Sequence, residues 1–385
     1  MWGGDRFVMK YLMVDISGKV PKYDVALSEA IASCLSPNDE FTLLAANINP
    51  KSVECKSKRL LSLVPKKFQN SENIFKRVVK ALEGLLNYVY LVLYIFFRRP
   101  TVIHFQWLPF LEITSIEGVF LDLIKKIVPK SKIILTVHNI YPHNSSEKKR
   151  INYKSRFAVV EKYFETFILH LHSSRSEFCK EFGISESRCK VIPHGIFEPK
   201  NVKITPEKQD EKLRIIMYGN QSYYKGTDIL IDAIAMLPKD IQEKMSTTII
   251  GQTSAPYLKI LQEKSSGLDV KIIPKYVSDG VLHKMIIESD VVVLPYREIS
   301  QSGALSLALY FERPFICSDL PSFRETLDGV DEGMFFESEN VASLSNLIKK
   351  VVDSSFDVAK WKKNCITLKK RYSWKNIAMM YMKDD

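Results

Sequence analysis

Short apolar runs alternate along this chain with longer stretches in which apolar residues recur at helical spacing. The first unit is the run 11–15, a Ser-Gly turn at 17–18, and helical spacing over 25–34. The short runs are continuously apolar, as in parallel strands that are covered on both faces. The pattern predicts an α/β protein that opens with the strand, turn and helix of a doubly wound sheet.

The same alternation continues in two series that are separated by a polar segment. The first series predicts strands at 41–45, 101–105, 132–137 and 190–195, and helices at 75–97, 120–128 and 159–171. The second series predicts strands at 213–218, 247–251, 270–274, 291–295 and 314–318, and helices at 227–237, 256–265, 279–288, 302–311 and 341–352. The segment between them is charged and broken by prolines, which is typical of a linker.

Two series indicate two domains, and 385 residues exceed what one hydrophobic core usually fills. We predict two Rossmann-like doubly wound domains that face each other across an interdomain cleft. The predicted boundaries are 1–195 for the N-terminal domain, 196–212 for the linker, 213–368 for the C-terminal domain and 369–385 for a terminal helix. Ligands of such sheets bind beyond the carboxyl ends of the strands.

One strand end in the second series has the composition of a phosphate site. Gly219 to Gly226 leaves a predicted strand and enters a predicted helix, with Lys225 just before the helix. A glycine lets the backbone approach a ligand, a helix start offers free N–H groups, and a lysine supplies a positive charge. A plain solvated turn is the alternative.

A second strand end in the same series has similar features. Ser302 and Gly303 precede a predicted helix, Arg297 adds a fork of donors, and Glu298 offers a carboxylate for sugar hydroxyls or developing positive charge. The alternative is a helix cap beside an Arg297–Glu298 pair. Two such turns in one sheet support each other as halves of one site.

These segments resemble the GT-B glycosyltransferases of the family 4 type. The resemblance rests on 220–226, 291–295, Gln301-Ser-Gly, 314–319 and the 191–195 segment, on Thr136-Val-His138-Asn139 with Pro142-His143, and on 372–381. It covers nearly the whole chain, most strongly 213–325 and least 50–100. It implies a retaining, nucleotide-sugar-dependent hexosyltransferase whose last helix crosses back to the first domain.

The resemblance also implies a role for each matching position. Gly219, Asn220, Lys225 and Gly226 would hold the donor diphosphate, with Gln301, Ser302 and Gly303 capping it from the other side. Tyr276 and Val277 would meet the nucleobase, His138 would hydrogen-bond the donor sugar, and Glu298 would lie near its ring. Gly18 and Lys19 would line the acceptor side of the cleft.

The chain departs from the family pattern at two places. Asn220 stands where the phosphate turn usually has an arginine, and we expect Arg297 to supply the missing positive charge. The family's two glutamates, eight positions apart, are not both present: starting from Glu298 the partner position is Ser306, and an alignment on Pro314 gives Ile299 and Leu307. The usual ribose contact by the second glutamate is therefore not predicted.

The expected mechanism needs no metal or other cofactor. Cations and helix starts stabilise the diphosphate as it leaves the sugar, and no Asp-x-Asp motif occurs to hold a metal ion. As an isolated residue, His138 is more often a satisfied core histidine, but its loop favours a donor contact. A non-catalytic GT-B partner at the membrane and a nucleotide-sugar epimerase are the alternatives.

Charge and cysteine usage indicate where the protein works. The net charge of +11 fits phosphorylated substrates or an anionic membrane better than nucleic acid, because no basic run is interleaved with aromatics. Six scattered cysteines and no signal-like N-terminus predict a cytoplasmic chain that is either free or peripheral on the inner face of the membrane. The apolar run 88–97 is too short to span a bilayer, so it is either a core helix or a helix resting on the membrane. We expect a lipid-linked or free glycan acceptor, as in bacterial surface polysaccharide (capsule, O-antigen or exopolysaccharide) assembly.

Overall fold

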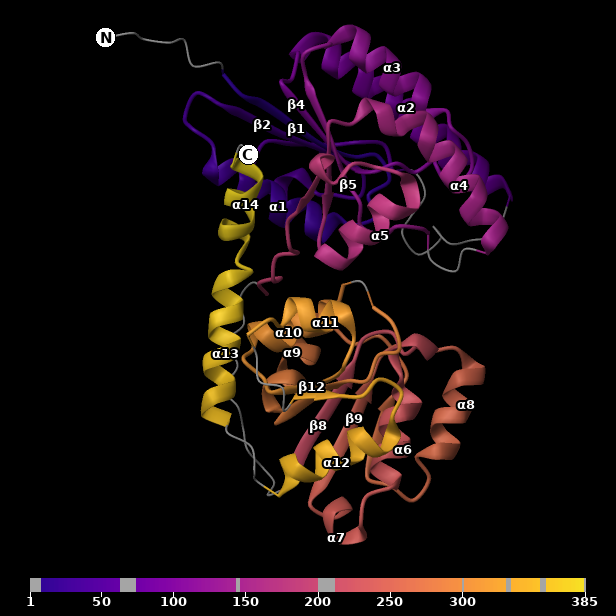
Figure 1. Cartoon of the computed structure of the whole chain (residues 1–385), viewed down its shortest axis with the longest axis vertical. Coiled ribbons are helices and arrows are strands. Elements are labelled where there is room, and N and C mark those ends of the chain that lie inside the picture. The colour runs from indigo at the N-terminus through magenta and orange to yellow at the C-terminus, as the bar shows by residue number, and fades with distance from the viewer. Residues whose placement is uncertain are drawn as a thin grey trace. The chain divides into compact units, whose positions relative to one another are not determined.

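The computed structural model describes residues 8–62, 74–142, 146–199, 212–299, 301–329, 334–353 and 358–383. Its contacts divide the chain into two compact units (Figure 1). Unit 1 comprises Met1–Gly195 and Trp374–Asp385, and unit 2 comprises Ile196–Ser373. The first unit thus ends at Gly195, the residue where the sequence analysis places the end of the N-terminal domain.

Unit 1 contains a seven-stranded sheet in the order β3-β2-β1-β4-β5-β6-β7, and every strand pair in it is parallel. The order reverses at β1, which is the switch point of a doubly wound sheet. The strands are β1 (Lys10–Asp15), β2 (Glu40–Ala45), β3 (Ser57–Arg59), β4 (Val102–Trp107), β5 (Lys132–Thr136), β6 (Thr166–Leu169) and β7 (Cys189–Val191).

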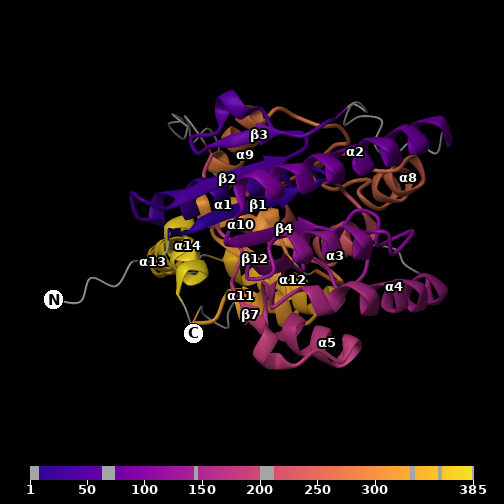
Figure 2. The ribbon, with the colours of Figure 1, turned by 90° about the horizontal axis from the view of Figure 1, so that it is seen from above.

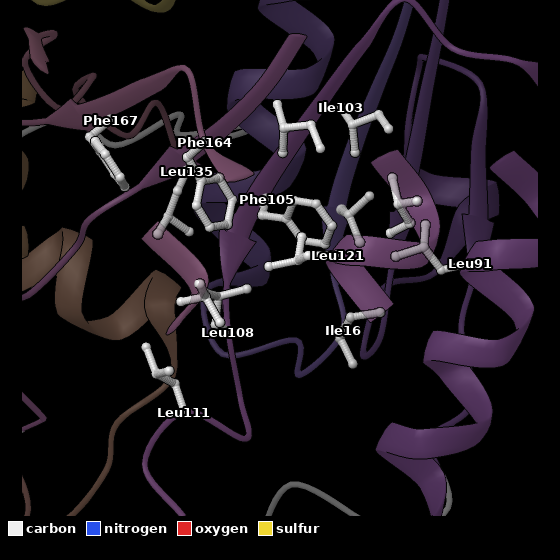
Figure 3. Close-up of a cluster of buried hydrophobic side chains, with 14 of the residues drawn as sticks. Ile16, Leu91, Ile103, Phe105, Leu108, Leu111, Leu121, Leu135, Phe164 and Phe167 are labelled. Atoms are coloured by element: carbon white, nitrogen blue, oxygen red, sulfur yellow. The ribbon is translucent and has the colours of Figure 1, made fainter. Parts of the chain in front are cut away.

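Helices cover both faces of this sheet. The helices α2 (Ile74–Arg98), α3 (Glu117–Ile127), α4 (Glu147–Val160) and α5 (His172–Phe182) contribute to one core cluster with β1, β4, β5 and β6. Figure 2 shows α2, α3 and α4 side by side, and Figure 3 shows Phe105 of β4 at the centre of their core, with Leu91 of α2 pointing into it. The other face carries α1 (Pro21–Cys34) and α14 (Trp374–Met382), which pack on each other.

Unit 2 contains a six-stranded parallel sheet in the order β10-β9-β8-β11-β12-β13, again with its switch point at the first strand. The strands are β8 (Leu213–Tyr218), β9 (Met245–Ile250), β10 (Val270–Ile273), β11 (Val291–Leu294), β12 (Phe315–Ser318) and β13 (Phe335–Phe336). The helices are α6 (Thr227–Ala235), α7 (Lys239–Gln242), α8 (Ala255–Lys264), α9 (Asp279–Glu288), α10 (Gly303–Tyr310), α11 (Pro321–Thr326), α12 (Val341–Val352) and α13 (Val358–Arg371).

The prediction of two Rossmann-like domains is confirmed, but two segments differ from it. The helix predicted over 159–171 is wrong: α4 ends at Val160, and residues 166–169 form the fully buried strand β6. A strand buried on both faces is a continuous apolar run, which periodicity alone does not separate from a helix. The terminal segment predicted from 369 begins later, because α13 belongs to unit 2 and only α14 returns to unit 1.

Candidate functional site

Three glycine turns meet at the carboxyl edge of the unit 2 sheet. Gly219 follows β8, Gly226 precedes α6 and Gly251 follows β9, and all three have positive φ angles. A Cβ atom on Gly226 would overlap the carbonyl oxygen of Pro295, and one on Gly251 would overlap that of Gly219. The backbones therefore pack directly against one another, which only glycine permits.

Lys225 lies buried inside this group of turns. A Cβ atom on Gly219 would come within 2.5 Å of the Lys225 Nζ, and that Nζ is 5.2 Å from the centroid of the Tyr296 ring. Burial lowers the pKa of Lys225 to about 8. In the described ranges no carboxylate forms an ion pair with it. The turn therefore holds a desolvated ammonium group that an anion would neutralise.

Gln221 fixes the shape of the turn, and sequence reasoning did not single it out. Its side-chain amide donates to the carbonyl oxygens of Gly219 (2.6 Å) and Ile250 (3.0 Å), and its oxygen accepts from Thr227 Oγ1 (2.6 Å). The side chain is almost fully buried. A polar residue two positions after a glycine at a strand end was the available signal.

The aromatic ring of Tyr296 connects the turn before α10 with the turn that contains Lys225. Tyr296, which contacts Lys225, also forms a side-chain hydrogen bond with Ser302. Ser302 is the N-cap of α10, because its hydroxyl accepts from the backbone N–H of Leu305 (3.1 Å). Gly303 has no atom within 4 Å of an added Cβ, so the helix start is open on that side. Tyr296 thus brings Lys225 and the α10 N-terminus close together.

Arg297 does not supply the missing cation, which corrects that expectation. Its Nη1 and Nη2 pair with both carboxylate oxygens of Asp228 (3.0 and 2.7 Å), Nη1 also donates to the Tyr223 carbonyl, and Nε donates to Glu339 (3.2 Å). The guanidinium group also stacks 3.8 Å over the Tyr223 ring. Its hydrogen-bonding groups are engaged within unit 2. By binding Tyr223 and Asp228, on either side of Lys225 in the sequence, Arg297 stabilises the Lys225 turn.

The remaining predicted donor residues lie at the surface. Asn220 and Glu298 are exposed, and Tyr276 is 71% exposed with its hydroxyl donating weakly to Asp279 (3.4 Å). Tyr276 and Val277 follow β10, two strands away from β8 in the sheet. Gln301 is half-buried beside Ser302. No described contact joins Tyr276 or Glu298 to Lys225.

In unit 1, His138 belongs to a chain of histidines at the carboxyl edge of the sheet. Its Nε2 lies 3.3 Å from the Gln106 amide and its Nδ1 lies 3.4 Å from His170 Nε2. The other ring nitrogen of His170 is 2.9 Å from the carbonyl oxygen of Ile192. The Gln106 amide also reaches His104 (3.1 Å). Pro142 is described, whereas His143 lies outside the described residues.

Burial keeps these histidines neutral. It lowers the pKa of His104 to about 3, that of His170 to about 4 and that of His194 to about 3, and it lowers the pKa of His138 well below its ordinary value. A neutral imidazole has one donor and one acceptor nitrogen.

The carbonyl group of Ile192 determines which nitrogen donates and which accepts in the hydrogen bonds between these histidines. The Ile192 oxygen accepts only, so His170 Nδ1 carries the proton and its Nε2 accepts from His138 Nδ1. His138 Nε2 is then an acceptor. The structure places Gln106 Oε1 toward this nitrogen, so the His170 tautomer requires the Gln106 amide to be turned over. Both ring nitrogens of His138 have partners inside unit 1, so a sugar hydroxyl would have to replace one of these long contacts.

A small cavity opens beside His138. It encloses about 40 Å³ and is lined by apolar and aromatic side chains together with His138, Asn139 and Glu112. Trp107 stacks on the His138 ring at 5.8 Å between centroids. That volume holds at most one or two water molecules.

The Gly18 turn after β1 is built around a buried carboxylate. Asp15 Oδ1 accepts from the backbone N–H groups of Ser17 and Gly18 and from the Ser17 hydroxyl, each at 2.9 Å. Burial, followed by the charge of Asp15 and a hydrogen bond to it, raises the pKa of Asp24 well above its ordinary value. This shift favours the protonated form of Asp24 next to the Asp15 carboxylate. Lys19 next to the turn is paired with Glu112 (2.7 Å) and lies over the Trp107 ring.

Most of unit 2 matches a known protein family in sequence. Residues 200–367 match the family model described as "Glycosyl transferases group 1". A GDP-mannose:glycolipid 4-beta-D-mannosyltransferase of Xanthomonas campestris pv. campestris is 31% identical over 144 residues, which cover 36% of this chain and 40% of that protein. The chain therefore aligns with well under half of this relative's length.

Solved structures match nearly the whole chain. A glycosyltransferase from Rickettsia africae ESF-5 has a TM-score of 0.69 at 16% identity and covers 98% of this chain and 97% of its own. Anabaena HepE in complex with UDP and glucose has a TM-score of 0.67 at 14% identity, covering 97% of this chain and 98% of its own. The chain has the GT-B fold. At these identities the structural match shows the fold alone.

Across the ranges that the structure describes, no group of three or more His, Cys, Asp or Glu residues is arranged to hold a metal ion. His104, His138 and His170 of unit 1 are joined instead to one another, to the Gln106 amide and to the Ile192 carbonyl group.

Proposed function

We propose that this GT-B chain is a glycosyltransferase that moves a sugar from a nucleotide-diphosphate sugar to a glycan or lipid-linked glycan. The observation that carries the proposal is Lys225: its buried ammonium group has no carboxylate partner among the described residues and lies against the Gly219 backbone. An unpaired buried charge is costly, and a bound diphosphate would neutralise it. The family match covers the same residues.

The chemistry asked of this site is stabilisation of the leaving group. When the bond between the anomeric carbon and the phosphate oxygen breaks, negative charge grows on the diphosphate and positive charge grows on the sugar ring. Lys225 and the free N–H groups at the α10 start are fixed in place before the reaction, so they stabilise that negative charge without rearranging. We propose that these groups replace a metal ion, and activity that survives a chelator is the expected result.

The donor is proposed from the relatives and from the surface beyond β10. The Xanthomonas relative is named for GDP-mannose, and HepE was solved with UDP-glucose. Tyr276 exposes most of its ring, which a nucleobase would cover by stacking. Donor panels should therefore begin with GDP-mannose and UDP-glucose and extend to dTDP-sugars.

Retention of configuration is a prediction from the family 4 resemblance. The name of the Xanthomonas relative specifies a β-linked mannose, which corresponds to inversion when the donor is α-linked, so the two sources of expectation differ. The anomeric configuration of the product, measured by proton NMR, tests retention directly. A product of the donor's own configuration is expected, and the opposite anomer would contradict the prediction.

The acceptor and the place of reaction are also part of the proposal. The Xanthomonas relative is named for a glycolipid acceptor. We propose that this chain acts in the cytoplasm on a lipid-linked glycan of a surface polysaccharide pathway. Radiolabelled sugar that partitions into solvent with lipid-linked acceptor, and not into water as free sugar or an epimerised nucleotide sugar, is the expected outcome.

Replacing Lys225 by methionine separates binding from stability. Loss of the ammonium group should weaken donor binding about 100-fold in calorimetry, because a charged hydrogen bond in a buried site contributes about 2–3 kcal/mol. The same change should stabilise the free protein by up to about 3 kcal/mol at pH 7, since the folded chain no longer holds a desolvated cation.

The pH dependence of that gain follows from the lowered pKa. The unfolded chain binds more protons at residue 225 between pH 8 and about 10.5, so wild-type stability rises with pH in that window and the gain of Lys225→Met disappears. Lys259→Met, whose side chain is 79% exposed, is the matched control and should change neither quantity. Unchanged donor affinity in Lys225→Met would overturn the proposed function.

A further inference from the structure

Helix α2 presents a long apolar stripe to solvent. Its members recur at helical spacing over about five turns, or about 28 Å, and each is 40–75% exposed. They are Val78, Leu82, Leu86, Val89, Tyr90, Leu93, Phe96 and Phe97. The only charged residues between the ends of this stripe are Glu83, which is buried, and Lys80, which is half-buried. Exposed apolar patches of this size mark interaction surfaces.

The opposite face of α2 is fixed in the core of unit 1. Tyr88, Leu91 and Ile95 are completely buried and belong to one core cluster with Ile103, Phe105 and Leu121, and Figure 3 shows Leu91 at the edge of that cluster. The Tyr88 hydroxyl donates to Glu117 (2.8 Å) and the Asn87 amide pairs with the backbone of Leu61. By length and composition 78–98 could cross a membrane, with only 28% of it buried. Its anchored face keeps it in the fold, so the stripe is available for a surface and not for spanning.

The neighbouring helix extends the apolar surface. Helix α3 packs against α2 through stacked Tyr88 and Phe120 rings, and it exposes Val119 (68%) and Leu123 (43%) one turn apart. Arg98 and Arg99 stand at the end of the stripe, where Arg99 lies over the Phe96 ring. An apolar face bordered by arginines matches the boundary between acyl chains and headgroups.

The charge of the chain is concentrated in the unit that carries the stripe. Unit 1 contains 31 Lys and Arg against 20 Asp and Glu, whereas unit 2 contains 24 of each. The whole net charge of +11 therefore belongs to unit 1. This net positive charge attracts an anionic bilayer and repels a second copy of the same unit.

We propose that the α2 stripe, with Val119 and Leu123 of α3, docks unit 1 on the surface of an anionic lipid bilayer. The apolar residues would enter the boundary below the headgroups, and the excess positive charge of unit 1 would draw the protein to the membrane. The inference stands on this surface alone and does not require the donor site in unit 2. In this proposal unit 1 binds the bilayer itself, whereas a lipid-linked acceptor alone would only require the reaction to take place near a membrane.

Flotation of the full chain with vesicles of phosphatidylcholine and phosphatidylglycerol in equal parts tests the inference. Wild-type protein should float with these vesicles and bind at least about tenfold more weakly to pure phosphatidylcholine. The double variant Leu86→Glu/Leu93→Glu should lose about tenfold or more in vesicle affinity, because it removes two inserting side chains and adds negative charge. Met236→Glu/Ile260→Glu, at similarly exposed apolar positions in unit 2, should bind as wild type.

Two further readouts separate the possible failures. Both double variants should unfold at the wild-type temperature within a few degrees, since all four positions are exposed, and both should bind donor like wild type. Wild-type protein that stays with the soluble fraction, or a Leu86→Glu/Leu93→Glu variant that floats equally well, would overturn the inference. A stripe-dependent dimer in sedimentation equilibrium without vesicle binding would also overturn it and would identify a second copy as the occupant.

Discussion

The two units handle buried polar groups at their strand ends in opposite ways. Unit 2 buries Lys225 with no carboxylate partner in the described residues and packs three glycine turns around it. Unit 1 joins His104, His138 and His170 into a hydrogen-bonded chain whose members are neutral and mutually satisfied. A site that binds a charged ligand can contain a buried charge with no partner in the protein. A polar cluster that only supports the fold has hydrogen-bond partners for its own polar groups.

The largest expected difference between the units appears on mild acidification. The unfolded chain protonates its histidines near pH 6.5, while burial holds His104, His170 and His194 of unit 1 unprotonated to about pH 3–4. Stability is therefore present above pH 6.5 and falls as the pH drops below it, by about 2 kcal/mol per histidine at pH 5 and about 6 kcal/mol for His104, His170 and His194 together. Unit 2 contains one histidine, His283.

Amide hydrogen exchange between pH 7 and pH 5 measures this directly. Protection should fall first in β4, β5 and β6, while β8 and β11 retain theirs. Asp24 acts in the opposite sense, because its raised pKa makes acid relieve a cost, and it reduces the total. Earlier loss of protection in unit 2 would show that the histidine chain does not control acid stability.

A matched pair of glycines compares close packing with backbone strain alone. Gly226 in unit 2 and Gly183 in unit 1 have nearly the same φ, +67° and +68°, but an added Cβ meets the Pro295 carbonyl at Gly226 and nothing within 4 Å at Gly183. Gly183→Ala should cost about 1–2 kcal/mol of unfolding free energy. Gly226→Ala should cost about 4 kcal/mol or more, because backbone must move. Equal losses in urea unfolding would mean that the turns of unit 2 are loosely packed.

The smallest expected effect concerns Arg297. Arg297→Lys keeps the charge but loses the two-pronged contact with Asp228, so the free energy of unfolding should fall by about 1–2 kcal/mol. Donor affinity in calorimetry should change by less than about threefold, because the guanidinium faces its own unit. A loss of donor affinity as large as that of Lys225→Met would show that Arg297 contributes directly to donor binding.

Much of the fold and half of the unit 2 site could be predicted from residue order alone. Strands such as 213–218 and helices such as 279–288 were placed correctly, because continuous apolar runs and helical spacing are local signals. Lys225 and Ser302 were each recognised from a glycine or cap residue at a strand end. Their approach through Tyr296 follows from the parallel order of β8 and β11.

The errors concern pairings that depend on residues far away in the sequence. Arg297 appeared available for a ligand because its partner, Asp228, lies 69 positions earlier. Gln106 and His170 became partners of His138 only when three strands were aligned in one sheet. Burial of a polar side chain and the identity of its partner are tertiary facts, so sequence spacing does not reveal them.

The return of the chain to unit 1 has a consequence for synthesis. Helix α14 buries Ile377 and Ala378, its Tyr381 hydroxyl lies 3.1 Å from that of Tyr23, and the Trp374 ring lies where a Cβ on Gly195 would be 2.5 Å away. On the ribosome, this helix emerges after all of unit 2. Unit 1 is translated first, but one face of its sheet stays incomplete until residues 374–382 have been made, so unit 1 can finish folding only after unit 2 has been synthesised.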